Sequence, residues 1–214
     1  MRPNNIHLTF SLLGFILLMQ AGCLGPVTNK PTQFYELSSL YSHEPAPAPV
    51  ADLSQTTIGV GPVRIPKKLD RPQIVTRVNP NEIRLNEFKN WGEPLASGLS
   101  RVLAENLSLL LNTERVAIFP WMQAVRTDYQ VTVDVTDFIG TAGSTVQLRA
   151  WWTIFGDNGR TLLAKRYLYS TEPVSGDDIT ALVQAQSRTV ETLSRKIAAT
   201  IKELSQGSQP GAEK

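Results

Sequence analysis

Residues that could carry out chemistry are scarce in this sequence of 214 residues. The only cysteine is Cys23, and the two histidines are His7 and His43. A disulfide needs two cysteines, and a Cys/His zinc site or a histidine base needs side chains that the sequence lacks after residue 43. These three kinds of site are therefore excluded from the later segments.

Carboxylates and serines offer no clearer catalytic set. Asp134 and Asp137 are an odd number of positions apart in an expected strand, so we expect their side chains on opposite faces. Asp177 and Asp178 suit the start of a helix better than an acid/base pair. The sequence contains no Gly-x-Ser-x-Gly or Ser-x-x-Lys motif. We therefore expect neither an enzyme, nor a metal site, nor a cofactor.

Amino-acid composition excludes two further classes of protein, nucleic-acid-binding proteins and disordered chains. The chain has 21 basic and 19 acidic residues, a net charge of +2, and 42% apolar residues. A nucleic-acid-binding domain would normally carry a strong basic excess, and a disordered chain would have fewer apolar residues. The composition predicts a folded protein that does not bind nucleic acid.

The first 22 residues have the pattern of a lipoprotein signal peptide. A 12-residue apolar run, 8–19, follows a short polar start and ends before Ala21-Gly22-Cys23. The run is too short to span a bilayer, which takes about 20 apolar residues. Small residues before the sole cysteine resemble a bacterial lipobox, although Gln20 stands where Leu is usual. The alternative is a plain secretory signal with an incidental cysteine.

Lipidation at Cys23 would make residues 23–32 a lipidated tether. Each buried acyl methylene contributes about 0.8 kcal/mol, so several chains would hold the protein at a membrane. In Gram-negative lipoproteins an Asp after the cysteine commonly marks inner-membrane retention, and here that position is Leu24. By this resemblance we expect an outer-membrane protein that faces the periplasm.

Residues 33–204 are expected to form a single domain, followed by a disordered tail at 205–214. A Pro/Ala-rich segment, 42–55, predicts a loop inside the domain. Alternating apolar residues or branched runs predict strands at 33–40, 57–65, 74–78, 82–85, 115–119, 129–138, 145–155 and 161–169. Asp157-Asn-Gly159 predicts a tight turn between the last two strands.

Helical spacing of apolar residues predicts two long helices, at 91–111 and 177–204. Pro94 is expected in the first turn of the earlier helix, and Asn112 at its end. The order of strands, helix, strands and helix predicts an α+β fold. We expect a mixed or largely antiparallel sheet with both helices packed on one face.

Several motifs in this order resemble one family. They include Ile58-Gly-Val-Gly-Pro-Val63, Leu69-Asp-Arg-Pro-Gln-Ile-Val-Thr-Arg77, Trp91-Gly-Glu-Pro-Leu95 and Val102-Leu-Ala-Glu-Asn-Leu107. Together they resemble the PqiC-type (paraquat-inducible protein C) lipoproteins, also called ABC-type transport auxiliary lipoproteins. The resemblance covers nearly the whole mature chain.

The resemblance implies a non-enzymatic outer-membrane adaptor that supports envelope integrity. Its partners would be an MCE-domain tunnel protein (PqiB-like) that crosses the periplasm to move lipids, and the inner-membrane partner of that tunnel. The adaptor could also form a homo-oligomer. The alternative is a periplasmic small-ligand-binding or structural envelope-stress lipoprotein.

Four residues are candidates for a partner surface. Arg71 and Arg77 flank a Pro-containing turn, where an internal Asp/Arg contact is the alternative to docking. Trp151 lies opposite the apolar face of its strand and near Arg149, so we expect an exposed indole beside a cation. Trp91 is expected to be buried at the start of the first helix.

Overall fold

The computed structural model describes residues 30–42, 45–121 and 125–207. Cys23 and the signal segment lie outside these residues. Thr32–Lys214 form one compact unit, and all described helices and strands belong to it. The strands are β1 (Gln33–Tyr35), β2 (Ile58–Arg64), β3 (Gln73–Asn79), β4 (Glu82–Trp91), β5 (Val116–Ile118), β6 (Tyr129–Gly140), β7 (Thr145–Gly156) and β8 (Thr161–Pro173). The helices are η2 (Leu40–Ser42), α2 (Leu95–Leu111) and α3 (Ile179–Gly207).

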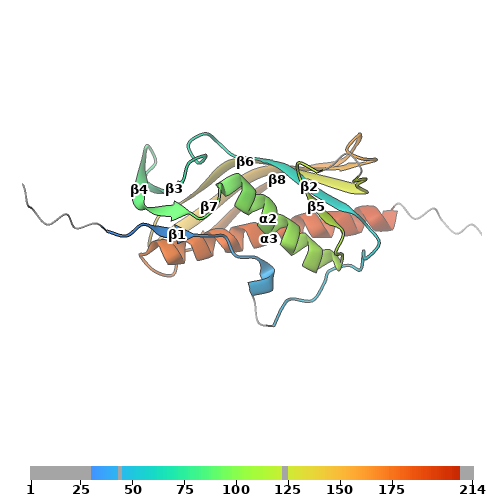
Figure 1. Cartoon of the computed structure of the whole chain (residues 1–214), viewed down its shortest axis with the longest axis horizontal. Helices are drawn as coiled ribbons and strands as arrows, with labels where there is room; N and C mark the ends of the chain where they lie inside the picture. Colours follow the sequence, from blue (N-terminus) through green and yellow to red (C-terminus); the bar gives the residue numbers. More distant parts are fainter. Residues whose placement is uncertain (1–29, 43–44, 122–124, 208–214) are drawn as a thin grey trace, which may run out of the picture. The chain divides into compact units, whose positions relative to one another are not determined.

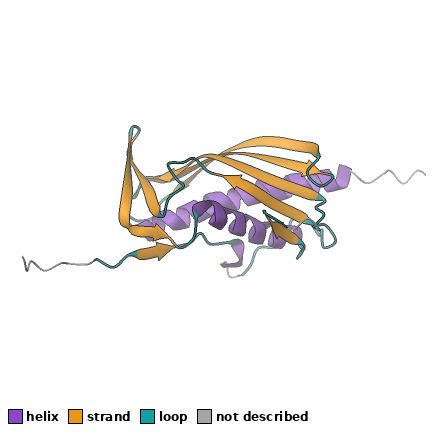
Figure 2. Cartoon of the chain, turned by 45° about the horizontal axis from the view of Figure 1, so that its top comes forward, coloured by secondary structure: helices purple, strands orange, loops and turns teal. Residues whose placement is uncertain are grey.

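The eight described strands form one mixed, open sheet around β6. One side of β6 pairs with β7 and then β8 in antiparallel register. Its other side pairs in parallel with β2 and, at one point, with β3. Beyond β2 lies β5, and beyond β3 lie β4 and then β1. The sheet is drawn as orange ribbons in Figure 2.

Both long helices cover the same face of this sheet (Figures 1 and 2). α2 packs against β2 and β5, α3 packs against β6, β7 and β8, and the two helices pack against each other. α3 buries one apolar stripe at helical spacing, made of Leu182, Val190, Leu193, Ile197 and Ile201. Each buried aliphatic side chain contributes roughly 1.5–3 kcal/mol, so this stripe fixes the helix to the sheet. The predicted α+β class and helix placement are confirmed.

None of the described helices covers the opposite face of the sheet. Along β7, every second side chain from Val146 onward is buried: Val146, Leu148, Ala150, Trp152 and Ile154. Alternate residues on the same strand, such as Arg149 and Trp151, are exposed. This alternation creates the outer face, on which the candidate partner residues lie.

The predicted hairpin between β7 and β8 is confirmed. Its turn places Asp157, Asn158 and Gly159 at positive φ (52°, 52° and 82°), where Asn, Asp and Gly are tolerated. In β2, Gly61 has a φ of +118°, and a Cβ there would lie 2.7 Å from the Cβ of Phe119. The close approach of Phe119 and the positive φ therefore both favour glycine at this position.

Several element boundaries differ from the predictions. β4 continues to Trp91 and not only to Leu85, and β8 continues to Pro173 and not only to Tyr169. The first strand ends at Tyr35 rather than Leu40, because the chain turns at Ser38–Leu40 to enter η2. Trp91 does not open a helix but ends β4, and Pro94 is the N-cap residue of α2. α3 begins at Ile179, where Asp178 Oδ1 accepts a hydrogen bond from the Ala181 amide at 2.7 Å, and it continues to Gly207.

Candidate functional site

The outer face of the sheet brings three of the four candidate partner residues together. Strand register places Asp134 of β6 beside Trp151 of β7, and Trp151 beside Tyr167 of β8. Register partners share a face, so charged and aromatic side chains form a row across the strands. Arg64 of β2 extends this row, because it is the register partner of Asp134.

A second row runs beside the first. Asp137 is the register partner of Arg149, which is in turn the partner of Tyr169. The expectation that Asp134 and Asp137 point to opposite faces is wrong, because the register with β7 shifts between Val135 and Asp137. One extra residue in a strand reverses the alternation beyond it. Both carboxylates therefore lie on the outer face.

Ion pairs engage both of these carboxylates. Arg64 Nη1 lies 3.1 Å from Asp134 Oδ1, while Asp137 receives Arg77 Nη2 at 3.2 Å and Lys68 Nζ at 3.5 Å. The Asp137 side chain is only 15% exposed, so its two cations are screened less than an exposed pair would be. Arg77 thus makes an internal contact that ties β3 to β6.

The aromatic residues form the other half of the outer face. The rings of Trp151 and Tyr167 are 5.1 Å apart, with Lys165 Nζ 5.5 Å from the Trp151 ring. The Arg149 guanidinium lies 5.1 Å from the Tyr169 ring. All three rings are exposed, by 43%, 47% and 53% for Trp151, Tyr167 and Tyr169. We call Arg149, Trp151, Lys165, Tyr167 and Tyr169 the aromatic-cationic face.

This arrangement suits binding rather than bond-making chemistry. Arg149 and Lys165 have no carboxylate partner among the described residues, so their charges remain available. Aromatic rings beside cations are the side chains most often found at the centres of protein interfaces. Within the described part of the chain, no three His, Cys, Asp or Glu side chains are grouped so as to hold a metal ion.

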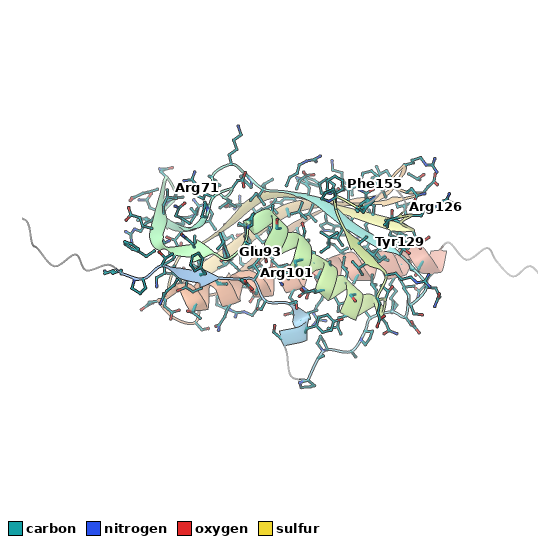
Figure 3. All side chains as sticks on the ribbon, in the orientation of Figure 1. Arg71, Glu93, Arg101, Arg126, Tyr129 and Phe155 are labelled. Atoms are coloured by element: carbon teal, nitrogen blue, oxygen red, sulfur yellow. The ribbon has the colours of Figure 1, made fainter. Side chains whose placement is uncertain are left out.

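Arg71, the fourth candidate, lies elsewhere. It lines a cavity of about 310 Å³ between the turn at Asp70–Pro72 and the turn at Trp91–Pro94 (Arg71 is labelled in Figure 3). The Trp91 amide donates to the Pro72 carbonyl at 2.7 Å, which holds the two turns together. Arg71 Nε is buried and has no hydrogen-bond partner in the described structure. The turn before β3 and the turn after β4 therefore meet at one hollow.

Glu93 closes one side of this hollow and is held by Arg101 of α2 at 2.8 Å (both labelled in Figure 3). Partial burial acts to lower the pKa of Arg101, but its hydrogen bonds to Glu93 and Glu105 outweigh that effect and raise the pKa above its ordinary value. Arg101 also donates to the Leu37 carbonyl at 3.2 Å. The cluster fixes the chain after β1 to the start of α2.

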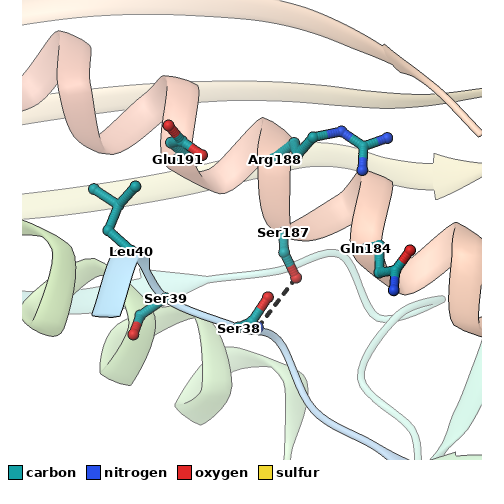
Figure 4. A pocket seen from close by; sticks show the side chains of 7 residues that line it. All are labelled: Ser38, Ser39, Leu40, Gln184, Ser187, Arg188 and Glu191. Atoms are coloured by element: carbon teal, nitrogen blue, oxygen red, sulfur yellow. Dashed lines mark hydrogen bonds between the residues drawn. The ribbon is translucent and has the colours of Figure 1, made fainter. Parts of the chain in front are cut away.

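A smaller, polar hollow lies between Ser38–Leu40 and α3 (Figure 4). Its volume is about 190 Å³, below the roughly 300 Å³ at which small-molecule sites usually begin. Ser187 Oγ accepts from the Ser38 amide at 3.1 Å, and Arg188 is engaged by Glu172 at 3.2 Å. These contacts connect the segment after β1 to α3 and leave few groups free for a ligand.

Sequence reasoning missed Lys165, Tyr167 and Tyr169 as members of the outer face. A usable signal was present, because positions 165, 167 and 169 are two residues apart in a predicted strand. Their side chains are therefore expected on one face. Pairing them with Trp151 and Arg149 required the hairpin register, which the sequence alone left open. The remaining candidate, Cys23, lies outside the described residues.

None of the described helices is both long enough and apolar enough to cross a membrane. The sequence profile of the ABC-type transport auxiliary lipoprotein component family matches residues 35–198, well over half of the chain. No curated protein sequence matches the chain significantly.

Two crystal structures have the same fold. Protein XCC0632 from Xanthomonas campestris is 19% identical, with a TM-score of 0.65 over 83% of this chain and 100% of that one. A protein described only as uncharacterized is also 19% identical, with a TM-score of 0.65 over 80% of this chain and 99% of that one. At this identity the likeness concerns the fold alone.

Proposed function

The chain belongs to the ABC-type transport auxiliary lipoprotein component family, and we propose that it is a non-enzymatic outer-membrane adaptor of an MCE-type intermembrane lipid transport system. In this role Cys23 carries the lipid anchor, and the folded domain faces the periplasm. The domain docks a periplasm-spanning MCE-domain tunnel protein, which is PqiB-like and works with an inner-membrane partner. The adaptor thereby supports envelope integrity.

The physical need for such an adaptor follows from the cargo. A phospholipid that crosses water exposes its acyl chains, at about 0.8 kcal/mol per methylene, so an apolar conduit has to meet the outer membrane at a defined place. A protein that is anchored by lipid and also holds the end of the conduit supplies this meeting point. It needs a docking surface and no catalytic group.

The observation that carries the docking role is the aromatic-cationic face. Trp151 and Tyr167 are in contact and exposed, Lys165 lies over the Trp151 ring, and Arg149 lies over the Tyr169 ring. The strands beneath them are buried on their other side by α3, so the surface is rigid before a partner arrives. A rigid surface loses little conformational entropy on binding.

Crosslinking in native membranes, followed by identification of the captured protein, tests this function. The adaptor should capture an MCE-domain protein, and replacing the exposed Tyr167 by Ala should reduce capture. Tyr41 is a matched control, because it is 54% exposed and lies in η2, which packs against α2 and not against the outer face. Equal capture by Tyr41→Ala and Tyr167→Ala, or no MCE-domain protein at all, would contradict the proposal.

The lipid anchor is tested separately by intact mass. The mature chain should begin at Cys23 and carry acyl chains at its sulfur and its amine. Cys23→Ser should remove the added mass and release the protein from membranes. Unchanged mass and retention in this variant would contradict the anchor.

A small-ligand-binding protein is the second candidate, and the hollow at Arg71 favours it. The volume of about 310 Å³ and the positive charge of Arg71, which lines the cavity, would suit a small anionic molecule. Native mass spectrometry of the purified chain distinguishes the two candidates. A tightly bound small molecule, lost in Arg71→Gln and found without any protein partner, would favour this candidate.

A further inference from the structure

A second exposed surface differs in chemistry from the aromatic-cationic face. It lies on β1, β3 and β4, where large apolar side chains are exposed by 40–67%. We call these side chains the apolar end: Phe34, Val78, Ile83, Leu85 and Phe88. β1, β3 and β4 are neighbours at one end of the sheet (Figure 1).

The β3–β4 hairpin has little cover from the rest of the domain. β3 pairs with β6 only where Thr76 meets Gly140. The residues beyond that point, 78–85, are all exposed. Exposed branched residues on an uncovered two-stranded ribbon are unusual in a monomeric soluble protein unless a further surface covers them.

Charges at the apolar end favour a partner without strong charge. On β4 the cations Arg84 and Lys89 are balanced by the carboxylates Glu82 and Glu87. Lys89 is engaged by the Gln33 side chain, and it lies 5.9 Å from the Tyr35 ring. β4 itself therefore has no net charge to attract an acidic protein or a strongly anionic surface.

The chain outside the described residues indicates which apolar surface lies within reach. Cys23 is ten residues before Gln33, the first residue of β1. A chain of ten residues spans at most about 35 Å even when fully extended. β1 is itself part of the apolar end, because Phe34 is the register partner of Asn90 in β4. A bilayer that holds the acyl chains of Cys23 is therefore present at high effective concentration at this end of the domain.

We propose that the apolar end is a second membrane contact, which rests on the lipid surface that anchors Cys23. This inference depends on the lipid anchor of the proposed function. Apolar and aromatic side chains on a short ribbon enter the headgroup region, while the balanced charges of β4 stay at its polar boundary. A covalent anchor alone leaves the domain free to tumble, whereas two contacts fix its direction.

A fixed orientation of the domain on the membrane would also determine where the far end of the sheet lies. β6 runs from its contact with β3 at Gly140 to Gln130, which lies near the β7–β8 turn. Ten residues of strand at about 3.3 Å each place that turn about 33 Å from the hairpin end. The sheet would then extend away from the membrane, and the aromatic-cationic face along it would be open to the periplasm.

Single-cysteine labelling of the lipidated mature chain in phospholipid vesicles tests this contact. Acylated Cys23 does not react, so Ile83→Cys and Phe88→Cys can each be labelled with a polarity-sensitive fluorophore. Leu162→Cys is the matched control, because Leu162 is 59% exposed and lies beside the β7–β8 turn. We expect blue-shifted emission, and at least twofold stronger quenching by nitroxide lipids, for positions 83 and 88 compared with 162. Adding anionic lipid should change these values little.

Each other outcome overturns the proposal in a recognisable way. Labels at 83 and 88 that match the control, on a chain that stays with the vesicles, would reject the membrane contact and leave the anchor intact. A chain that does not sediment with vesicles, and that takes a second label at Cys23, would reject both the contact and the anchor. Labels shielded from water without vesicles would show that a second copy of the chain covers the apolar end.

Discussion

The aromatic-cationic face and the apolar end are similarly exposed but differ in how their side chains are supported. The rings of Trp151, Tyr167 and Tyr169 stand on long strands whose other side is buried under α3, and cations lie over two of them. Ile83 and Leu85 stand on a ribbon with balanced charges and little cover. A rigid surface with directional groups suits a specific protein, whereas an adaptable apolar surface suits lipid.

The largest expected effect concerns a tryptophan that belongs to neither surface. Trp91 is 7% exposed and Trp151 is 43% exposed, so they differ in burial but not in residue type. Trp91→Ala should lower the free energy of unfolding by about 3–5 kcal/mol, because it leaves a cavity. Trp151→Ala should lower it by less than about 1 kcal/mol. Denaturant unfolding of both variants measures the difference.

Equal losses of unfolding free energy in Trp91→Ala and Trp151→Ala would contradict the difference in burial between the two tryptophans. They would indicate that another part of the same chain covers the outer face. The docking surface would then have to be sought elsewhere on the domain.

The next effect separates the two surfaces by their partners. Tyr167→Ala should weaken binding of the captured MCE-domain protein by about tenfold, as loss of an interface aromatic commonly does. Tyr41→Ala and Ile83→Ser should each change this affinity less than about twofold. Binding of the purified partner to each variant, measured at one ionic strength, gives the ratios. A larger loss for Ile83→Ser than for Tyr167→Ala would exchange the roles of the two regions.

A smaller effect tests how the outer face is fixed. Asp137 lies between Arg77 and Lys68, so Asp137→Asn should cost about 1–2 kcal/mol of stability. The more exposed pair of Asp134 and Arg64 should be worth less than about 0.5 kcal/mol, as tested by Asp134→Asn. Unfolding at low and high salt provides the check. Equal costs for both variants would show that the partial burial of Asp137 has no energetic consequence.

The smallest expected change in stability follows substitutions at the apolar end. Ile83→Ser and Leu85→Ser should each change the free energy of unfolding by no more than about 0.5 kcal/mol, because both side chains are already exposed. Thermal unfolding of the two variants in the absence of membranes measures this. A loss above about 2 kcal/mol would show that these side chains belong to the core.

Patterns within single elements were sufficient to predict most of the fold. Alternation of apolar residues alone predicted β6 and β7, and helical spacing of apolar residues predicted α3. Such local patterns report which side of an element is buried. They contain no information on how far one strand slides along another.

The outer face depends on that missing information. A simple tight turn at Asn158-Gly159 would pair Trp151 with Arg166, but a register shift between Ile154 and Phe155 pairs it with Tyr167 instead. A similar shift in β6 brings Asp137 to the face of Asp134. The alternation of Arg149 and Trp151 could be predicted, but their neighbours could not.

The most direct test of the account identifies what touches each surface in the same cells. A photoreactive amino acid is placed at position 167 or at position 83 of the lipidated chain, and the adducts formed in intact cells are analysed for protein and lipid. We expect an adduct with an MCE-domain protein from position 167 and adducts with phospholipid from position 83. Lipid adducts from position 167, or the MCE-domain protein captured from position 83 alone, would contradict this expectation.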